Sequence, residues 1–156
     1  MAAAGLFPDL LARLESVNAR RRSGAAAHES ERSFEREFAA HAQLAVYGSL
    51  APGRANAHEL GGLDGRWTDG LVVHGDLVDG GWGAVLGYPA LRWRADGPAV
   101  AVQLFRSAEL AAHWKRLDEF EGEEYRRILV PLFRAGVLVT VANLYAAASA
   151  EPSRRS

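Results

Sequence analysis

Cysteine is absent from the 156 residues of this chain. Its absence excludes disulfide bonds, thiolate catalysis and metal sites built from cysteine, and it fits a reducing compartment. The sequence also has no apolar run near the roughly 18 residues of a membrane-spanning helix. Its first residues lack the charged-then-apolar order of a signal peptide. We therefore expect a cytoplasmic protein with no membrane partner.

An excess of charge of one sign is missing as well. The 18 Lys and Arg residues nearly balance the 19 Asp and Glu residues, so the formal net charge is −1 at pH 7. Binding of nucleic acid generally requires a basic surface, so no nucleic-acid partner is expected. The five histidines show no ligand spacing, and no metal site is expected. What is present, 49% hydrophobic and 24% charged residues, is typical of a soluble globular protein.

The first 43 residues differ from the rest, because they are rich in Ala, Arg and Glu and poor in β-branched residues. Large apolar residues recur there at helical spacing, which predicts two amphipathic helices. These residues are Leu10, Leu14, Val17, Phe34 and Phe38. We expect the helices to dock on the remaining domain, or to pair with a second copy of the chain as a homodimer. Residues 20–24, three arginines followed by Ser and Gly, are expected to form an exposed joint between the helices.

From residue 44 onward, short apolar runs alternate with glycine-containing turns, which is typical of β-strands. The expected strands are 44–47, 71–78, 90–94, 99–105, 126–133 and 137–146. Asp96-Gly97 and residues 134–136 predict hairpin turns, and Gly70 is expected to precede the second strand. Pro131 indicates an edge or a bulge in its strand.

This order predicts an α+β fold, in which a small, mostly antiparallel sheet is closed or strongly curved into a β-barrel with flanking helices. A chain of 156 residues is long enough for one domain with its own hydrophobic core. We divide it into an N-terminal helical extension (1–43), the main domain (44–148) and a short frayed tail (149–156).

A single helix is expected over residues 107–120, before the last two strands. Ser107 can accept a hydrogen bond as its N-cap, and Gly122 can end it. At about 100° per residue, Glu121 lies within roughly 20° of Leu110 on the apolar side of this helix. The Glu121 carboxylate is therefore expected to face inward.

An inward carboxylate makes Glu121 the candidate catalytic residue. Burial raises the pKa of a carboxyl group toward the range in which it can accept and return protons near neutral pH. The alternative, on helix geometry alone, is a Glu in a frayed last turn that bends back to water. Glu119 points in about the opposite direction and is expected on the exposed face.

Two other patterns resemble sites with different chemistry, but each lacks residues that its chemistry requires. Residues 48–53 have the G-x-x-x-x-G spacing of a P-loop, but Arg54 and Ala55 stand where that loop needs Lys and then Ser or Thr. A glycosidase needs two carboxylates that face one sugar ring, and here only Glu121 is expected to point inward. The glycine turn can still offer backbone N–H groups to a carboxylate.

Several short motifs occur in order over about residues 44–147. They are Val46-Tyr47-Gly48-Ser49-Leu50, Gly53 with Asn56, Val73-x-Gly75-Asp76-Leu77, Tyr88-Pro89-Ala90-Leu91, Leu117-Asp118-x-Phe120-Glu121-Gly122-x-x-Tyr125-x-Arg127 and Ala142-x-x-Tyr145. Each motif is weak alone, but the ordered set is fairly specific. Together they resemble the γ-glutamylcyclotransferase-like family, also called the AIG2-like family.

The resemblance implies a small mixed β-barrel flanked by helices, and a cofactor-free enzyme of the acyltransferase or lyase type. Glu121 would take a proton from the α-amino group of a small γ-glutamyl compound. That amine would then close a five-membered ring on its own γ-carbonyl and release 5-oxoproline with the free amine. The substrate-binding residues that the resemblance implies are Tyr47, Gly48, Ser49, Leu50, Tyr125 and Tyr145.

The sequence leaves two readings of this pocket. Family domains usually begin close to the strand that ends at Tyr47, whereas 43 residues precede it here, and an extension of this kind can cover the pocket, alter substrate choice or form a dimer. The alternative to an enzyme is a non-catalytic module that binds a small carboxylate or amine, because that module would need the same residues.

Overall fold

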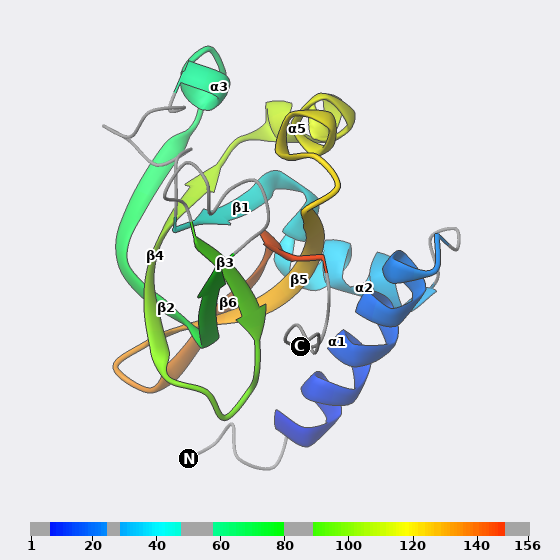
Figure 1. Cartoon of the computed structure of the whole chain (residues 1–156), viewed down its shortest axis with the longest axis vertical. Helices are drawn as coiled ribbons and strands as arrows, with labels where there is room; N and C mark the ends of the chain where they lie inside the picture. Colours follow the sequence, from blue (N-terminus) through cyan, green and yellow to red (C-terminus); the bar gives the residue numbers. More distant parts are fainter. Residues whose placement is uncertain (1–6, 25–28, 48–57, 80–88, 149–156) are drawn as a thin grey trace.

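Five strands close a mixed β-barrel in this computed structural model, which describes residues 7–24, 29–47, 58–79 and 89–148 (Figure 1). In the order in which they pair around the barrel, they are β1 (Gln43–Val46), β4 (Ala99–Arg106), β2 (Arg66–Asp79), β5 (Tyr125–Arg134) and β6 (Val137–Ala147). β6 returns to β1 through a parallel pairing, which closes the ring. β3 (Pro89–Trp93) is an additional strand that pairs with β2 and β6. The predicted α+β fold with a closed sheet is therefore confirmed.

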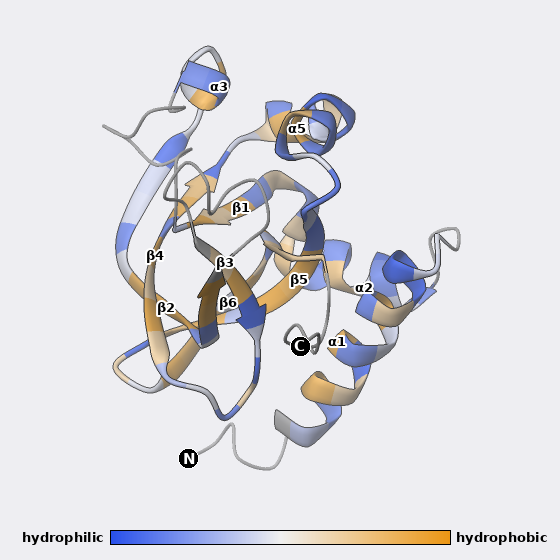
Figure 2. Ribbon diagram, in the orientation of Figure 1, coloured by the Kyte–Doolittle hydropathy of each residue, from blue (hydrophilic) through white to orange (hydrophobic). Residues whose placement is uncertain are grey.

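Aliphatic side chains from alternating strand positions fill the barrel. On β5 and β6 the inward residues are those with even numbers, and none of them is more than 7% exposed. They are Ile128, Val130, Leu132, Ala142, Leu144 and Ala146. Odd-numbered residues of the same strands face outward, and Leu129, Val141 and Tyr145 among them pack in the clusters that contain helix residues. Figure 2 shows hydrophobic residues concentrated on the barrel strands.

Two strand predictions are wrong in detail. Gly70, predicted to precede the second strand, lies within β2, where its φ of 82° accompanies a bulge between Thr68 and Leu71. Residues 96–97 form a turn but not a hairpin, because β3 and β4 pair with β2 and not with each other. The following Pro98 carbonyl accepts from the Gly75 N–H at 3.0 Å, so this connection passes over β2.

Gly75 lies where β2 is approached closely by neighbouring backbone. A Cβ at this position would stand 2.5 Å from the Arg92 carbonyl oxygen and 3.1 Å from the Trp93 Cα. Backbone in a paired strand cannot move aside cheaply, so Gly75→Ala is expected to lower the free energy of unfolding by about 1–3 kcal/mol in denaturant titrations. Gly61→Ala is the matched control, because nothing lies within 4 Å of its added Cβ. Equal, small effects of both substitutions would contradict the close approach.

The hairpin predicted around residues 134–136 is confirmed. β5 and β6 pair antiparallel on either side of it, and Ala135 and Gly136 have φ values of 53° and 79°. Positive φ at both central residues is typical of a type I′ turn, whose twist matches that of the two strands.

The N-terminal extension forms the two predicted helices, α1 (Phe7–Arg22) and α2 (Glu29–Phe38), and they pack on the outer face of the barrel (Figure 1). Leu14 and Phe34 are fully buried there against Leu129 and Val141. The apolar sides of both helices therefore cover outward-facing residues of β5 and β6.

β2 pairs with β5 only near Phe133, and Asn18 of α1 bonds to the backbone of β5 further along, where no strand of the described residues lies beside it. Its side-chain amide accepts from the Leu129 N–H and donates to the Leu129 carbonyl, both at 2.9 Å. Pro131, two residues further along the same edge, has no N–H that needs a partner. The edge predicted from Pro131 is confirmed, and a register shift follows between Leu132 and Phe133. The extension thus satisfies a strand edge that would otherwise be open to another chain.

The joint between α1 and α2 is less exposed than the sequence predicted. Ser23 and Gly24 end α1 on the surface, but the Arg21 side chain is only 13% exposed. Its guanidinium lies 2.7 Å from Glu31 of α2 and 2.7 Å from the Asn143 amide oxygen of β6. A guanidinium can be buried where carboxylate and amide oxygens accept its hydrogen bonds, and composition alone does not reveal such partners.

The helix predicted over residues 107–120 is divided in two. Ser107 caps η3 (Ala108–Ala112), a 3-10 helix, by accepting from the Glu109 N–H at 3.0 Å, and α5 (Trp114–Glu121) follows. His113 separates them, with φ −116° and ψ 1°, outside the helical range. A short helix, α3 (His58–Gly61), precedes β2. None of the helices in the described ranges is long and apolar enough to cross a membrane.

Candidate functional site

Glu121 is the last residue of α5 and is half-buried. Leu117, one turn earlier, is fully buried in a cluster with residues of β1 and β6, and this contact sets the rotation of α5. Glu119 is exposed, as the helical spacing predicts. Gly122, with a φ of 84°, ends the helix directly after Glu121. The candidate carboxylate is therefore held at the inner end of a packed helix.

Burial and, to a smaller extent, the negative charge of Asp118 together raise the pKa of Glu121 to about 7. A carboxyl group with this pKa exchanges its proton near neutral pH. Burial also raises the pKa values of Tyr47, Tyr125 and Tyr145, and the charge of Glu121 contributes to all three shifts. Glu121 thus lies within electrostatic range of every tyrosine that the resemblance assigns to the pocket.

The Tyr47 hydroxyl joins β1 to two other strands. It donates to the Tyr145 carbonyl of β6 at 2.6 Å and accepts from the Leu91 N–H of β3 at 2.8 Å. With these bonds made, the hydroxyl mainly fixes the end of β1 against its neighbours. The remaining predicted residues of that turn, Gly48, Ser49 and Leu50, lie outside the described residues.

Asp118 is a second carboxylate beside Glu121, which the sequence analysis did not single out. It accepts from the Tyr145 hydroxyl at 2.6 Å and forms a two-point ion pair with Arg127, at 2.9 and 3.2 Å. The Arg127 guanidinium also stacks over the Trp114 ring, 4.5 Å from its centre. Paired in this way, the Asp118 carboxylate holds the Tyr145 and Arg127 side chains in place. Its position three residues before Glu121 was the available signal, because residues three apart share a helix face.

The same network extends into the N-terminal extension. The Asn143 side-chain oxygen accepts from Arg127 at 3.3 Å and from Arg21 at 2.7 Å. Asn143 is fully buried, and its amide nitrogen donates to the Ala40 carbonyl at 2.8 Å. Arg21 of α1 is therefore linked through Asn143 and Arg127 to the Asp118 carboxylate beside Glu121.

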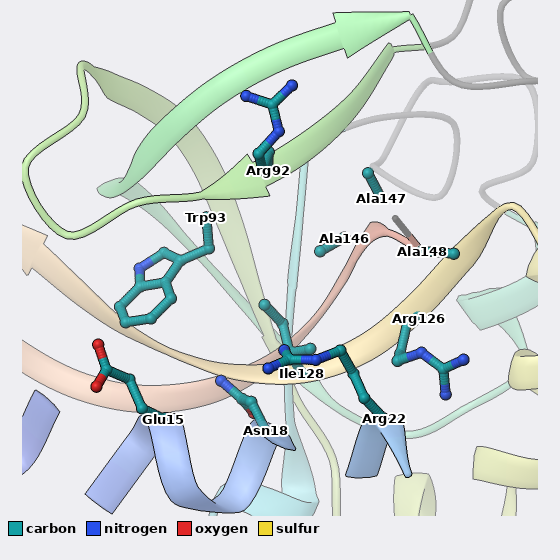
Figure 3. A pocket seen from close by; sticks show the side chains of 10 residues that line it. All are labelled: Glu15, Asn18, Arg22, Arg92, Trp93, Arg126, Ile128, Ala146, Ala147 and Ala148. Atoms are coloured by element: carbon teal, nitrogen blue, oxygen red, sulfur yellow. The ribbon is translucent and has the colours of Figure 1, made fainter. Parts of the chain in front are cut away.

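Two cavities lie where the extension meets the barrel. One, of about 330 Å³, is lined by Asp118, Tyr125 and Tyr145 together with residues of the extension. The other, of about 190 Å³, lies between α1 and β3 (Figure 3). In that view Glu15 and Trp93 lie at one end, and the Arg126 side chain lies at the other and points away from them. Within the described part of the chain, no group of three or more His, Asp or Glu side chains could hold a metal ion.

A model of the family described as "Gamma-glutamyl cyclotransferase, AIG2-like" matches residues 44–155. The chain belongs to this family. The matched range contains Glu121, Asp118 and the three tyrosines, and it begins after α1 and α2. The extension therefore lies outside the part of the chain that the family model matches.

Solved structures also share the fold of this AIG2-like chain. A crystal structure of an AIG2-like protein from Mus musculus is 20% identical, with a TM-score of 0.53 over 72% of this chain and 80% of that chain. A solution structure of At5g39720.1 from Arabidopsis thaliana is 17% identical, with a TM-score of 0.51 over 71% of each chain. Among curated proteins, none matches the sequence. At such identities the structures support the fold alone.

The raised pKa of Glu121 predicts a cost to the stability of this AIG2-like protein. Glu ordinarily titrates near 4.5, so between about pH 4.5 and 7 the folded chain holds one proton more than the unfolded chain. The free energy of unfolding attributed to Glu121 therefore falls as pH rises through this window. In denaturant titrations we expect Glu121→Gln to gain about 1–3 kcal/mol over the wild type between pH 4 and pH 8. A difference that does not change with pH would contradict the buried carboxylate.

Proposed function

We propose that this chain is a γ-glutamylcyclotransferase-like enzyme that converts a γ-glutamyl amine or peptide into 5-oxoproline and the free amine. The observation that carries the proposal is a half-buried Glu121, with its pKa raised to about 7, amid Tyr47, Tyr125 and Tyr145 in a domain of this family. Such a carboxylate is matched to proton transfer near neutral pH.

The proposed reaction needs one proton relay and no cofactor. Glu121 takes a proton from the substrate's α-ammonium group, and the freed amine attacks the γ-carbonyl carbon of the same molecule. The new C–N bond closes a five-membered ring, the old C–N bond breaks, and Glu121 returns the proton to the leaving nitrogen. The ring nitrogen loses its second proton as the lactam forms, so the products are 5-oxoproline and the amine in its protonated form. Because nucleophile and electrophile belong to one molecule, positioning supplies much of the rate. In this scheme the 47–50 turn holds the glutamyl carboxylate, and Tyr125 and Tyr145 line the pocket.

The test is a panel of γ-glutamyl amino acids and γ-glutamyl amines, with 5-oxoproline and the released amine both quantified. We expect the two products in equal amounts from at least one compound. The matched control is an α-glutamyl dipeptide, whose amide cannot be displaced by its own amine through a five-membered ring. Binding of the γ-glutamyl compounds without 5-oxoproline would instead support a non-catalytic module.

A further inference from the structure

The cavity of about 330 Å³ beside Asp118 has one wall from each part of the chain. Asp118, Tyr125 and Tyr145 come from the AIG2-like domain, and Arg21 and Glu31 come from the extension. The wall from the extension lies outside the range matched by the family. Any recognition that it supplies is therefore not carried over from the family.

Of the three arginines that line this cavity, two form ion pairs with carboxylates of the described residues and one does not. Arg21 is paired with Glu31 at 2.7 Å, and Arg127 is paired with Asp118 at 2.9 Å. Arg126 also lines the cavity, and no carboxylate of the described residues lies within salt-bridge distance of it. The cavity thus has a net positive charge, which favours an anionic ligand.

The Arg126 guanidinium has N–H groups that can donate hydrogen bonds to a ligand. Its Nη1 lies 3.5 Å from the Arg21 carbonyl oxygen, a long contact that places the guanidinium against the end of α1. Its buried Nε has no hydrogen-bond partner among the described residues. A guanidinium presents paired donors that match a carboxylate. Arg126 also lines the second cavity, where Figure 3 shows its side chain pointing away from Glu15 and Trp93.

The cavity is adjacent to the proposed reaction centre. Tyr125 and Tyr145 line it, and the charge of Glu121 contributes to the raised pKa of each. Asp118, which also lines it, precedes Glu121 by one turn of α5. The nitrogen that leaves during cyclisation receives its proton from Glu121, so the group attached to that nitrogen lies close to this cavity.

We propose that this cavity holds the leaving group of the substrate and that Arg126 binds its carboxylate. The inference rests on the proposed function and deepens it: the preferred substrates are γ-glutamyl amino acids, and γ-glutamyl derivatives of simple amines react less well. In a γ-glutamyl amino acid the carboxylate is one carbon away from the leaving nitrogen. The extension is then part of the substrate site, because Arg21 and Glu31 form its outer wall.

The test compares γ-glutamyl-alanine with γ-glutamyl-ethylamine, which differ only in the carboxylate on the leaving group. We expect the wild type to favour the alanine compound at least about tenfold in kcat/KM, and Arg126→Gln to bring this ratio close to one. Arg126→Lys, which keeps the charge but loses the paired donors, should retain part of the preference. Arg134→Gln, an exposed arginine at the far end of β5, is the control and should leave the ratio as in the wild type. A wild-type ratio near one, or equal losses for both compounds in Arg126→Gln, would overturn the proposal.

Binding to Glu121→Gln separates this inference from the proposed reaction. Calorimetric titration of that variant with the same two compounds should give tighter binding of the alanine compound, and adding Arg126→Gln should remove the difference. Equal affinities in Glu121→Gln would overturn the carboxylate site even if the wild type were active. If no compound of the panel released 5-oxoproline, the proposed reaction would fail, and this binding difference would still decide the role of Arg126.

Discussion

Glu121→Gln is expected to lower kcat for release of 5-oxoproline by about a hundredfold or more, the range typical of a lost general acid–base group. The amide has nearly the shape of the carboxylate but cannot accept the substrate's proton at neutral pH. Substrate affinity should change much less, since the proposed glutamyl carboxylate contacts lie in the 47–50 turn. The measurement is kcat and KM on the best compound of the γ-glutamyl panel.

Glu119→Gln is the matched control for this substitution. Glu119 lies two residues earlier on the exposed face of α5, so removal of its charge should leave kcat within about twofold. Circular dichroism of both variants should match the wild type. A Glu121→Gln protein that kept wild-type kcat would rule out the proposed proton relay.

Removal of the N-terminal extension is expected to cause the largest loss of stability. A chain that begins at Gln43 would expose Leu129 and Val141, both fully buried in the intact protein, and would leave the β5 edge without Asn18. At roughly 1.5–3 kcal/mol for each large side chain, this exposure alone predicts a fall of at least about 3 kcal/mol in the free energy of unfolding. That is a large part of the stability of a typical domain. Denaturant titration and solution mass of both chains provide the measurement, and unchanged values would refute the docking argument.

A point substitution tests the same interface without shortening the chain. Leu14 of α1 is fully buried, so Leu14→Ala is expected to cost about 2–5 kcal/mol. Ser16→Ala on the exposed side of α1 is the control and should change stability by less than about 0.5 kcal/mol. Similar effects of the two substitutions would contradict the packing of α1 on the barrel.

Local rules were sufficient for several features of this protein. The half-buried side of α5 on which Glu121 lies agrees with the prediction, but Leu117, one turn earlier and fully buried, accounts for it, because Leu110 lies in the separate helix η3. The turn at residues 134–136 and the cap at Ser107 also depend on neighbouring residues, and the sequence predicted both. The two helices of the extension and their docking follow from the spacing of their large apolar residues.

Contacts between distant residues decided the rest. The residues around Arg21 predict an exposed side chain. It is largely buried instead, because Asn143, 122 positions away, accepts its hydrogen bond. Asp118 becomes part of the site because Tyr145 and Arg127 of β6 and β5 lie beside it. β3 and β4 look like a hairpin locally, but both pair with β2. The sequence by itself therefore determined most of the strands and the helices of the extension, whereas only the tertiary structure decided which strands pair and which groups partner the charges, since pairing across the barrel leaves no periodic signal in the chain.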